Sequence, residues 1–307
     1  MKYGISIIVR GEDATPAVLS SVAEKAEAVG LDALWASDHL ILPKQTVSRY
    51  PSTKDGQFPA FWKTCYFQPF SVLNYLAAKT RRVRLGTSVL VLPMRNPIEV
   101  ATQVAEMDQL SNGRVDFGVG VGWFVEEFEA LGYSFRERGA RTNEGLDICK
   151  ALWSEGSATF HGRFYSFEEA HVGPKPVQRP HPPIYIGGST DAALKRVAKY
   201  GDVWHPLKPT PEQILEIKPR LDSALEAEGR TGEGFPIAPK VALTFQDGPA
   251  RPGQEPTEGR PQDIIDALKR FRDAGATEFC FDAKAETEQA TLDTIERFTQ
   301  EIRPKLE

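Results

Sequence analysis

The chain has 307 residues and a formal charge of −5, which argues against a nucleic-acid-binding surface because such a surface usually needs a basic field. No apolar run approaches the ~20 residues of a membrane-spanning helix, and the N-terminus lacks the pattern of a secretion signal. Three widely spaced cysteines and five histidines without ligand spacing predict neither a disulfide framework nor a metal site, so we expect a reduced, cytoplasmic protein.

Segments that read as strands alternate with segments that read as helices along nearly the whole chain. In the first helix, Thr15 is a candidate N-cap, Pro16 the first helical residue and Gly30 the stop signal. The predicted strands cover residues 2–9, 31–37, 83–92, 114–122, 184–188, 202–206, 240–245 and 278–283. The predicted helices cover residues 15–30, 69–80, 96–113, 125–131, 137–154, 190–201, 210–229, 260–276 and 291–306.

This alternation favours an α/β fold in which each strand is followed by a right-handed helical crossover, so that the strands are parallel. Eight such units predict a (β/α)8 TIM barrel, with an open doubly wound sheet as the alternative. Three segments interrupt the pattern: an aromatic-rich loop over about 40–69 after strand 2, an excursion over about 155–182 before strand 5, and a long loop over 246–260 after strand 7. We expect one domain over residues 1–307.

In a TIM barrel the chemistry gathers at the carboxyl ends of the strands. Asp38 and His39 follow the second strand, and Trp204 and His205 end the sixth. A histidine near a strand end can serve in catalysis or in structure, and the residues alone leave both readings open.

Two further strand ends carry glycines. The segment IYIGGSTDAALKRVA places Gly187, Gly188, Ser189 and Thr190 between a strand and a helix. Free backbone N–H groups there would attract a phosphate, although a tight turn with a hydroxyl N-cap explains the same residues. The glycines of DFGVGVGW do not match a dinucleotide-binding fingerprint. Small residues at a barrel rim leave room for a flat ring, although close packing within the barrel explains them equally.

Several motifs together resemble the bacterial luciferase-like flavin monooxygenase superfamily, and more narrowly its branch of deazaflavin (coenzyme F420)-dependent oxidoreductases. The resemblance covers nearly the whole chain. The segments that carry it are GLDALWASDHL, VRLGTSVLVLPMRNP, QLSNGRVDFGVGVGW, ERGARTNEGLDICKALW and PPIYIGGSTDAALKRVAKYGDVWHP.

The resemblance implies a site at the barrel mouth. A non-prolyl cis peptide bond between Ser88 and Val89 would bulge against the cofactor ring, and the phosphate-bearing tail would meet residues 187–190. Further residues expected around the ring are Asp38, Val91, Gly120 and Gly122. The Asp-His pair is typical of the F420 branch, whereas flavin-using relatives more often carry a Glu-His-His type sequence.

The resemblance also implies that His39 exchanges a proton with the substrate while a hydride moves to or from the ring, a role that suits the ordinary pKa of histidine. Sugar-phosphate dehydrogenases of this branch carry an acidic residue where this chain has Trp123, so we expect that acidic partner to be missing and the substrate to be rather apolar. Trp123, Trp204 and His205 would shape the substrate pocket.

Two alternatives remain open at the level of sequence. One is an FMN-dependent monooxygenase that uses reduced FMN and oxygen. The other is a non-catalytic flavin-binding family member, against which the full set of strand-end residues argues. Because dimers are common among relatives, we expect a homodimer.

Overall fold

A computed structural model describes residues 1–44, 46–50, 56, 66–154, 156–248, 253–285 and 287–306. Its main sheet contains eight parallel strands in the order β10-β13-β1-β2-β3-β5-β8-β9. These strands are β1 (Lys2–Ser6), β2 (Ala33–Ala36), β3 (Arg84–Thr87), β5 (Val115–Gly120), β8 (Ile184–Gly187), β9 (Val203–His205), β10 (Lys240–Ala242) and β13 (Glu278–Asp282).

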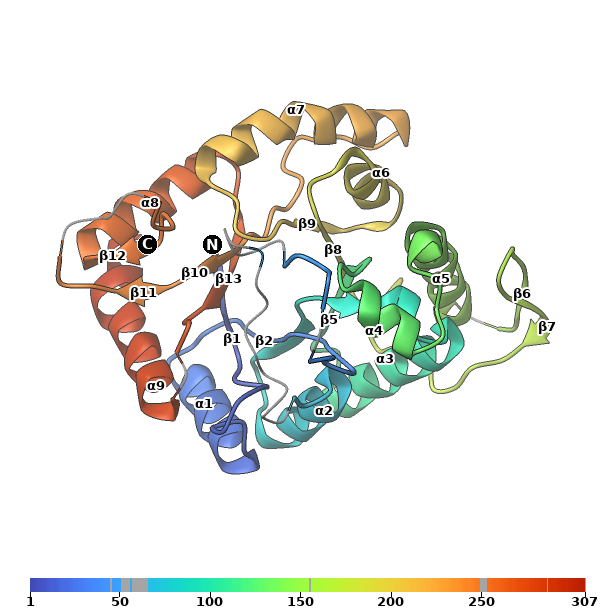
Figure 1. Ribbon diagram of the computed structural model, residues 1–307, viewed down its shortest axis with the longest axis horizontal. Coiled ribbons are helices and arrows are strands. Elements are labelled where there is room, and N and C mark those ends of the chain that lie inside the picture. The colour runs from blue at the N-terminus through green and yellow to red at the C-terminus, as the bar shows by residue number, and fades with distance from the viewer. Residues whose placement is uncertain are drawn as a thin grey trace.

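The two outer strands of this order come together and close the sheet. Isolated parallel bridges join Trp204 to Ile237 and Leu207 to Lys240, which links the β9 side to the β10 side. The predicted barrel is therefore confirmed. Helices form its outer layer (Figure 1). They are α1 (Pro16–Ala28), α2 (Pro69–Lys79), α3 (Pro97–Ser111), α5 (Arg138–Trp153), α6 (Asp191–Tyr200), α7 (Pro211–Ala227), α8 (Pro261–Asp273) and α9 (Glu288–Arg297). The short helix α4 (Val125–Ala130) follows β5 and lies inside this ring of helices.

Local sequence signals set the helix ends much as predicted. The hydroxyl of Thr15 accepts a hydrogen bond from the Val18 N–H at 3.3 Å, and Pro16 is the first residue of α1. At the C-terminal end of α3, Asn112 adopts the left-handed conformation that commonly ends a helix. These caps satisfy backbone groups that a helix end leaves without partners.

The strand predicted over residues 83–92 is interrupted in the structure. Strand β3 ends at Thr87, and a short strand β4 (Leu90–Val91) then pairs with β5. The interruption is Ser88–Val89, whose peptide bond is cis. Periodicity does not locate this break, because the apolar residues 89–92 that follow it still read as part of a strand.

Two of the three expected interruptions form small sheets of their own. The excursion before the fifth barrel strand is the antiparallel hairpin β6 (Ala158–His161) and β7 (Ser166–Ala170). The loop after the seventh barrel strand begins and ends with the parallel pair β11 (Thr244–Phe245) and β12 (Glu258–Gly259). Part of the predicted 40–69 loop, including its aromatic residues Phe58, Phe61 and Trp62, lies outside the described residues.

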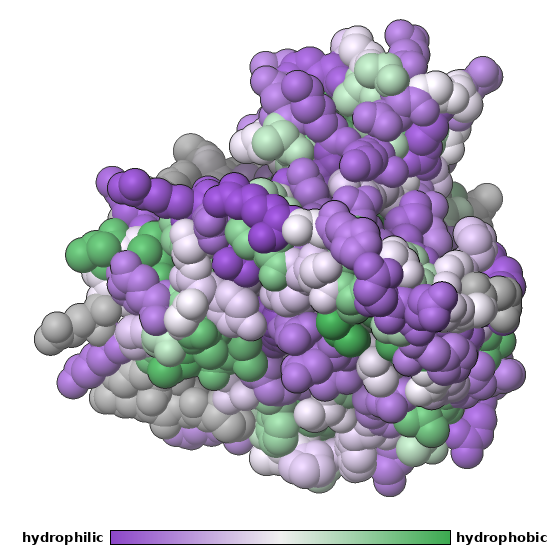
Figure 2. Space-filling view, turned by 90° about the vertical axis from the view of Figure 1, so that its right-hand side faces the viewer, coloured by the Kyte–Doolittle hydropathy of each residue, from purple (hydrophilic) through white to green (hydrophobic). Residues whose placement is uncertain are grey.

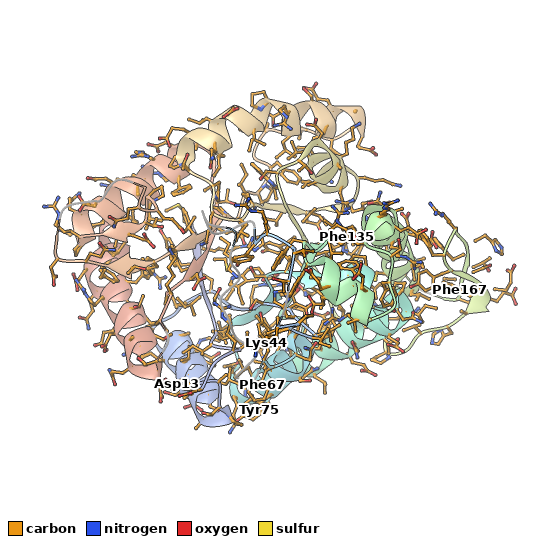
Figure 3. All side chains as sticks on the ribbon, in the orientation of Figure 1. Asp13, Lys44, Phe67, Tyr75, Phe135 and Phe167 are labelled. Atoms are coloured by element: carbon orange, nitrogen blue, oxygen red, sulfur yellow. The ribbon has the colours of Figure 1, made fainter. Side chains whose placement is uncertain are left out.

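Side chains fill the inside of the barrel (Figure 3), so it is a packed core rather than a pore. Trp35 lies at its centre, with its ring stacked on His205 at 5.4 Å between centroids and edge-on to Tyr185 at 5.1 Å. A larger apolar cluster fills the space between sheet and helices. The face toward the β6–β7 hairpin is largely hydrophilic, with separate small hydrophobic patches (Figure 2). None of the helices in the described ranges is long and apolar enough to cross a membrane.

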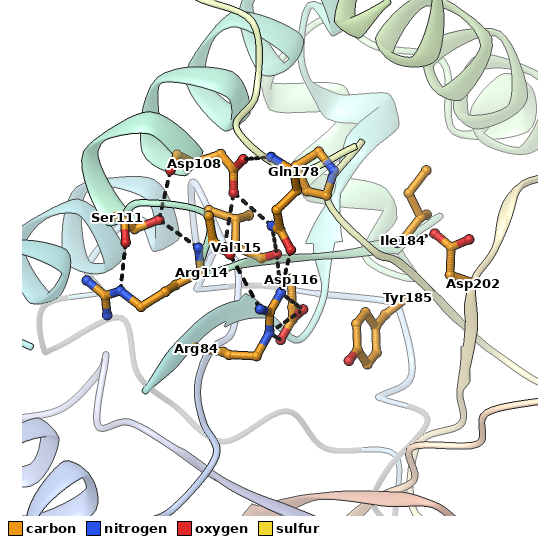
Figure 4. A network of polar contacts seen from close by, with 12 residues as sticks. Arg84, Asp108, Ser111, Arg114, Val115, Asp116, Gln178, Ile184, Tyr185 and Asp202 are labelled. Atoms are coloured by element: carbon orange, nitrogen blue, oxygen red, sulfur yellow. Dashed lines mark hydrogen bonds and ion pairs between the residues drawn. The ribbon is translucent and has the colours of Figure 1, made fainter. Parts of the chain in front are cut away.

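A polar network stabilises the barrel end opposite the expected site (Figure 4). The guanidinium of Arg84 contacts both carboxylate oxygens of buried Asp116 and also donates to Gln178 at 3.0 Å. Gln178 in turn donates to Asp108 and to the Val115 carbonyl, each at 2.8 Å. The network joins β3, β5 and the end of α3.

We expect Arg84→Met to lower the free energy of unfolding by about 3 kcal/mol, because it leaves the Asp116 carboxylate buried without its counter-charge. Urea unfolding followed by circular dichroism measures this. The matched control is Arg82→Met, which removes an exposed arginine two residues away and should change stability by no more than about 0.5 kcal/mol. Equal effects from the two substitutions would contradict a structural role for the Arg84–Asp116 pair.

Candidate active site

His39 lies at the end of β2 with a buried carboxylate beside it. Its Nδ1 atom is 2.9 Å from Oε2 of Glu127, a residue of α4 that is 1% exposed. Because a carboxylate accepts hydrogen bonds, this contact assigns the proton to Nδ1 and makes Nε2 the nitrogen through which the ring would exchange a proton.

The other oxygen of Glu127 binds the main chain that follows His39. Its Oε1 accepts from the Leu40 N–H at 2.5 Å and from the Ile41 N–H at 3.2 Å. One carboxylate therefore orients both the imidazole ring and the start of the loop after strand 2.

The neighbouring glutamate holds the same loop farther along. Glu126 accepts hydrogen bonds from the backbone N–H groups of Val47 and Ser48, and the Ser48 hydroxyl accepts from the Val125 N–H at 3.0 Å. Burial alone would raise the pKa of Glu126, but these hydrogen bonds keep that pKa below its ordinary value. Helix α4 thus binds residues 39–41 and 47–48 through two adjacent carboxylates.

Asp38 is buried and serves as an acceptor for other parts of the chain. It accepts from the Val91 N–H at 2.9 Å and forms a two-pronged ion pair with Arg95, with both contacts at 2.7 Å. Arg95 also donates to Gln68 at 2.9 Å, and Gln68 donates to the His39 carbonyl at 2.6 Å. Asp38 therefore ties the end of β2 to β4, next to the interruption at Ser88–Val89.

The interruption is supported from inside the barrel. The Ser88 hydroxyl lies 2.9 Å from His205 Nε2, while His205 Nδ1 lies 2.5 Å from the Ala238 carbonyl. Since a carbonyl only accepts, Nδ1 carries the hydrogen and Ser88 donates to Nε2. Burial lowers the pKa of His205 from 6.5 to about 4, so the ring is neutral at neutral pH.

Val89 lies against glycines of two neighbouring strands. It is half-buried, whereas Ser88 and Leu90 on either side are buried. A Cβ atom on Gly120 would lie 2.5 Å from Val89 Cγ2, and one on Gly187 would lie 3.4 Å from Val89 Cγ1. Only glycine fits at position 120 without displacing Val89. Val89 thus forms a bulge with glycine backbone, free of side chains, on either side. This shape suits contact with the face of a flat ring.

The glycine turn before α6 has a well-defined cap. Gly188 has a φ of +101°, which disfavours any other residue. The Thr190 hydroxyl accepts from the Ala193 N–H at 3.3 Å, which makes it the N-cap of α6. The N-cap reading of these residues therefore holds in the structure, and phosphate binding at the same turn stays a prediction.

Comparison with known proteins identifies the family. The model of the luciferase-like monooxygenase family matches residues 1–252. The chain belongs to this family.

Some of the proteins that this chain resembles are named for F420-dependent activities, and another is named as a monooxygenase. The chain is 34% identical to the F420-dependent glucose-6-phosphate dehydrogenase of Kineococcus radiotolerans, over 78% of this chain and 67% of that protein. The F420-dependent tetrahydromethanopterin reductase of Methanopyrus kandleri shares the fold, with a TM-score of 0.78, 16% identity and coverage of 100% and 99% of the two chains. The monooxygenase RslO1 of Streptomyces bottropensis also shares it, with a TM-score of 0.77, 22% identity and coverage of 99% of each chain.

The structure of this chain brings some of the expected site residues together and separates others. Trp123 lies beside His39, with ring centroids 6.2 Å apart, and stacks on Phe124 at 4.7 Å. Trp204 and His205, expected in the substrate pocket, are both buried. His205 points into the barrel and stacks on Trp35, whereas Trp204 belongs to the apolar cluster between sheet and helices. The Trp204 indole donates to the Gly188 carbonyl at 2.8 Å, and this hydrogen bond stabilises the turn at Gly188.

Three residues with clear positions in the site were not predicted from the sequence. Glu127 supplies a carboxylate to His39 from α4, although the acidic position implied by the resemblance is occupied by Trp123. Arg95 and Gln68 connect Asp38 to the His39 backbone. The only sequence signal was the pair of glutamates after GVGVGWFV, which looks like the exposed first turn of a helix.

The luciferase-like chain should lose stability between pH 7 and pH 5 because His205 cannot take up a proton while buried. Its pKa of about 4 in the folded chain lies below the ordinary 6.5. The unfolded state therefore binds more protons in this interval, and acidification favours unfolding by about 2 kcal/mol from this residue.

Urea unfolding of the wild type and of His205→Gln at the two pH values measures this contribution. The variant should lack that part of the pH dependence. Identical pH dependence in the two proteins would show that His205 titrates normally in the folded state.

Proposed function

We propose that the chain is an F420-dependent oxidoreductase that transfers a hydride between C5 of the deazaflavin ring and a small, rather apolar organic substrate. The observation that carries the proposal is the His39–Glu127 contact of 2.9 Å, at the same barrel rim as the Val89 bulge. The family membership and the F420-dependent glucose-6-phosphate dehydrogenase relative support it.

The residues around Val89 fit a flat ring. The bare backbone at Gly120 and Gly187 allows close approach on two sides of the bulge. Gly122 stands next along the rim, where a Cβ atom would lie 2.7 Å from Val91. We propose that Ser88, Val89 and Val91 contact the ring together with these glycines, and that Asp38 fixes the rim on which the ring lies.

The tail of the cofactor would meet Gly188, Ser189 and Thr190 at the start of α6. A helix N-terminus of this kind favours a negatively charged phosphate. When bound, the deazaflavin supplies the two-electron hydride chemistry, while the protein supplies position, exclusion of water and a proton.

We propose that His39 gives a proton to, or takes one from, the substrate oxygen or nitrogen through Nε2. Glu127 holds the opposite nitrogen and thereby selects the tautomer. Glu127 is therefore a positioning residue, whereas His39 is the catalytic one.

The surroundings of His39 favour an apolar substrate. The rings of Tyr66, Trp123 and Phe124 lie edge-on to the imidazole, with centroids between 5.4 and 6.2 Å away. Aromatic walls bind apolar groups and exclude water from the proton transfer.

Spectroscopic titration of the purified chain with F420 and with FMN tests the cofactor. We expect F420 to bind at least about tenfold more tightly, which corresponds to about 1.4 kcal/mol. Tighter binding of FMN would instead favour an FMN-dependent monooxygenase. Failure to bind either compound would favour a non-catalytic member of the family.

The same titration can locate the ring. Gly120→Ala should weaken F420 binding because the new methyl group displaces Val89. Gly139→Ala is the matched control: its Cβ atom would meet no atom closer than 3.7 Å, so binding should not change.

For the reaction, we expect His39→Gln to lower kcat/KM by about 10²–10⁴-fold, the usual range for a general acid or base, while the Kd of F420 stays within about threefold. Reduction of F420 by alcohols, and oxidation of reduced F420 by enones and imines, provide the assay. Glu127→Gln should give a smaller loss, and Glu129→Gln, at an exposed position of the same helix, should give none. Full activity of His39→Gln would remove the histidine from the mechanism.

A further inference from the structure

A polar layer lies inside the barrel directly beneath the Ser88–Val89 peptide. Ser88 follows β3, His205 ends β9, Lys240 begins β10 and Cys280 belongs to β13. The Lys240 ammonium donates to the Ser88 carbonyl at 3.3 Å, and the Cys280 thiol lies 3.7 Å from the Ser88 hydroxyl. Because β3 and β10 are far apart in the strand order, Lys240 reaches across the barrel to the peptide that carries Val89.

Lys240 is the charged member of this layer at neutral pH. Burial lowers the pKa of His205 to about 4 and raises the pKa of the Cys280 thiol, so both side chains are neutral. The Ser88 hydroxyl does not ionise. The half-buried Lys240 thus places one positive charge under the bulge.

Other lysines of this rim are neutralised by direct contacts. Lys208 pairs with Glu255 at 3.2 Å, and Lys284 pairs with both Glu255 and Glu258. Within the described ranges, no ion pair includes Lys240.

The compensating charge for Lys240 is more distant. Although burial alone would raise the pKa of Asp282, the positive charge of Lys240 is the strongest of the effects that hold it below its ordinary value. The Asp282 carboxylate is therefore ionised, but it does not form an ion pair with Lys240. A cation in this setting interacts strongly with additional negative charge because little solvent screens it.

We propose that Lys240 stabilises the negative charge of the reduced cofactor ring and so sets the reduction potential of the bound deazaflavin. The inference rests on the proposed function. Hydride addition at C5 brings one proton and two electrons to the ring. The electron pair is delocalised toward N1 and the C2 carbonyl of the pyrimidine portion, which becomes anionic unless it takes up a further proton. A nearby ammonium favours this reduced form over the neutral oxidised ring.

Anaerobic titrations with oxidised and with reduced F420 test the inference without any substrate. The wild type should bind the reduced form more tightly. In Lys240→Met, the affinity for the reduced form should fall about tenfold more than the affinity for the oxidised form. For a two-electron couple, this change corresponds to a potential lower by about 30 mV.

Two further variants separate charge from structure. Lys240→Arg keeps the positive charge and should keep the preference for the reduced form. Lys284→Met removes a cation of equal size from the same rim, but one already neutralised by two glutamates, and should leave the ratio of affinities unchanged. A melting curve for each variant checks folding, and Lys240→Gln replaces the methionine variant if that protein is unstable.

Three results would overturn the inference. The first is a wild type that binds both forms equally, which is decisive even if every variant is unstable. The second is a Lys240→Met variant with the wild-type ratio of affinities. The third is a Lys284→Met variant whose ratio of affinities changes as much as that of Lys240→Met. If the wild type binds neither form, the proposed function itself fails, and this outcome is distinct from the other three.

Discussion

A buried carboxylate is stable only when hydrogen-bond donors surround it. The candidate site is organised around two such carboxylates, those of Asp38 and Glu127. Asp38 takes its donors from β4 and Arg95, and Glu127 takes its donors from His39 and the two residues after it. Each carboxylate therefore joins segments that are distant in sequence. The position of the imidazole, the start of the loop after strand 2 and the end of the Ser88–Val89 bulge all follow from these contacts.

The two sides of the bulge differ in character. Toward the rim, Val89 lies against bare backbone at Gly120 and Gly187, an arrangement that suits a flat aromatic ring. Toward the barrel interior, Ser88 contacts a neutral histidine and the ammonium of Lys240. In the proposed function, one peptide unit thus separates the ring from the half-buried positive charge of Lys240. In that proposal, His39 after β2 exchanges the proton, and Lys240 of β10 stabilises the negative charge of the reduced ring. The two roles therefore belong to different strands.

Much of the fold could be predicted from the sequence because it depends on local signals. The helix starting at Thr15-Pro16 and the helix ending at Asn112 have caps that act within a few residues. The eight apolar strand segments required a parallel arrangement once helices separated them. The break at Ser88–Val89 could not be derived from periodicity, because a strand-like pattern does not mark where hydrogen bonding to the neighbouring strand stops. It was implied only by the family resemblance.

The sequence by itself determined the order of strands and helices, the barrel and the set of strand-end residues from which a site would be built. Tertiary structure decided which of those residues meet. Trp204 and His205 stand at a strand end but are buried on opposite faces of β9, where they bind the Gly188 carbonyl and the Ser88 hydroxyl. Glu127 looks like an exposed residue in the first turn of a helix, yet it is buried against His39. The physical reason is that hydrogen bonding and burial between distant segments depend on how the chain closes, and no local pattern records that closure.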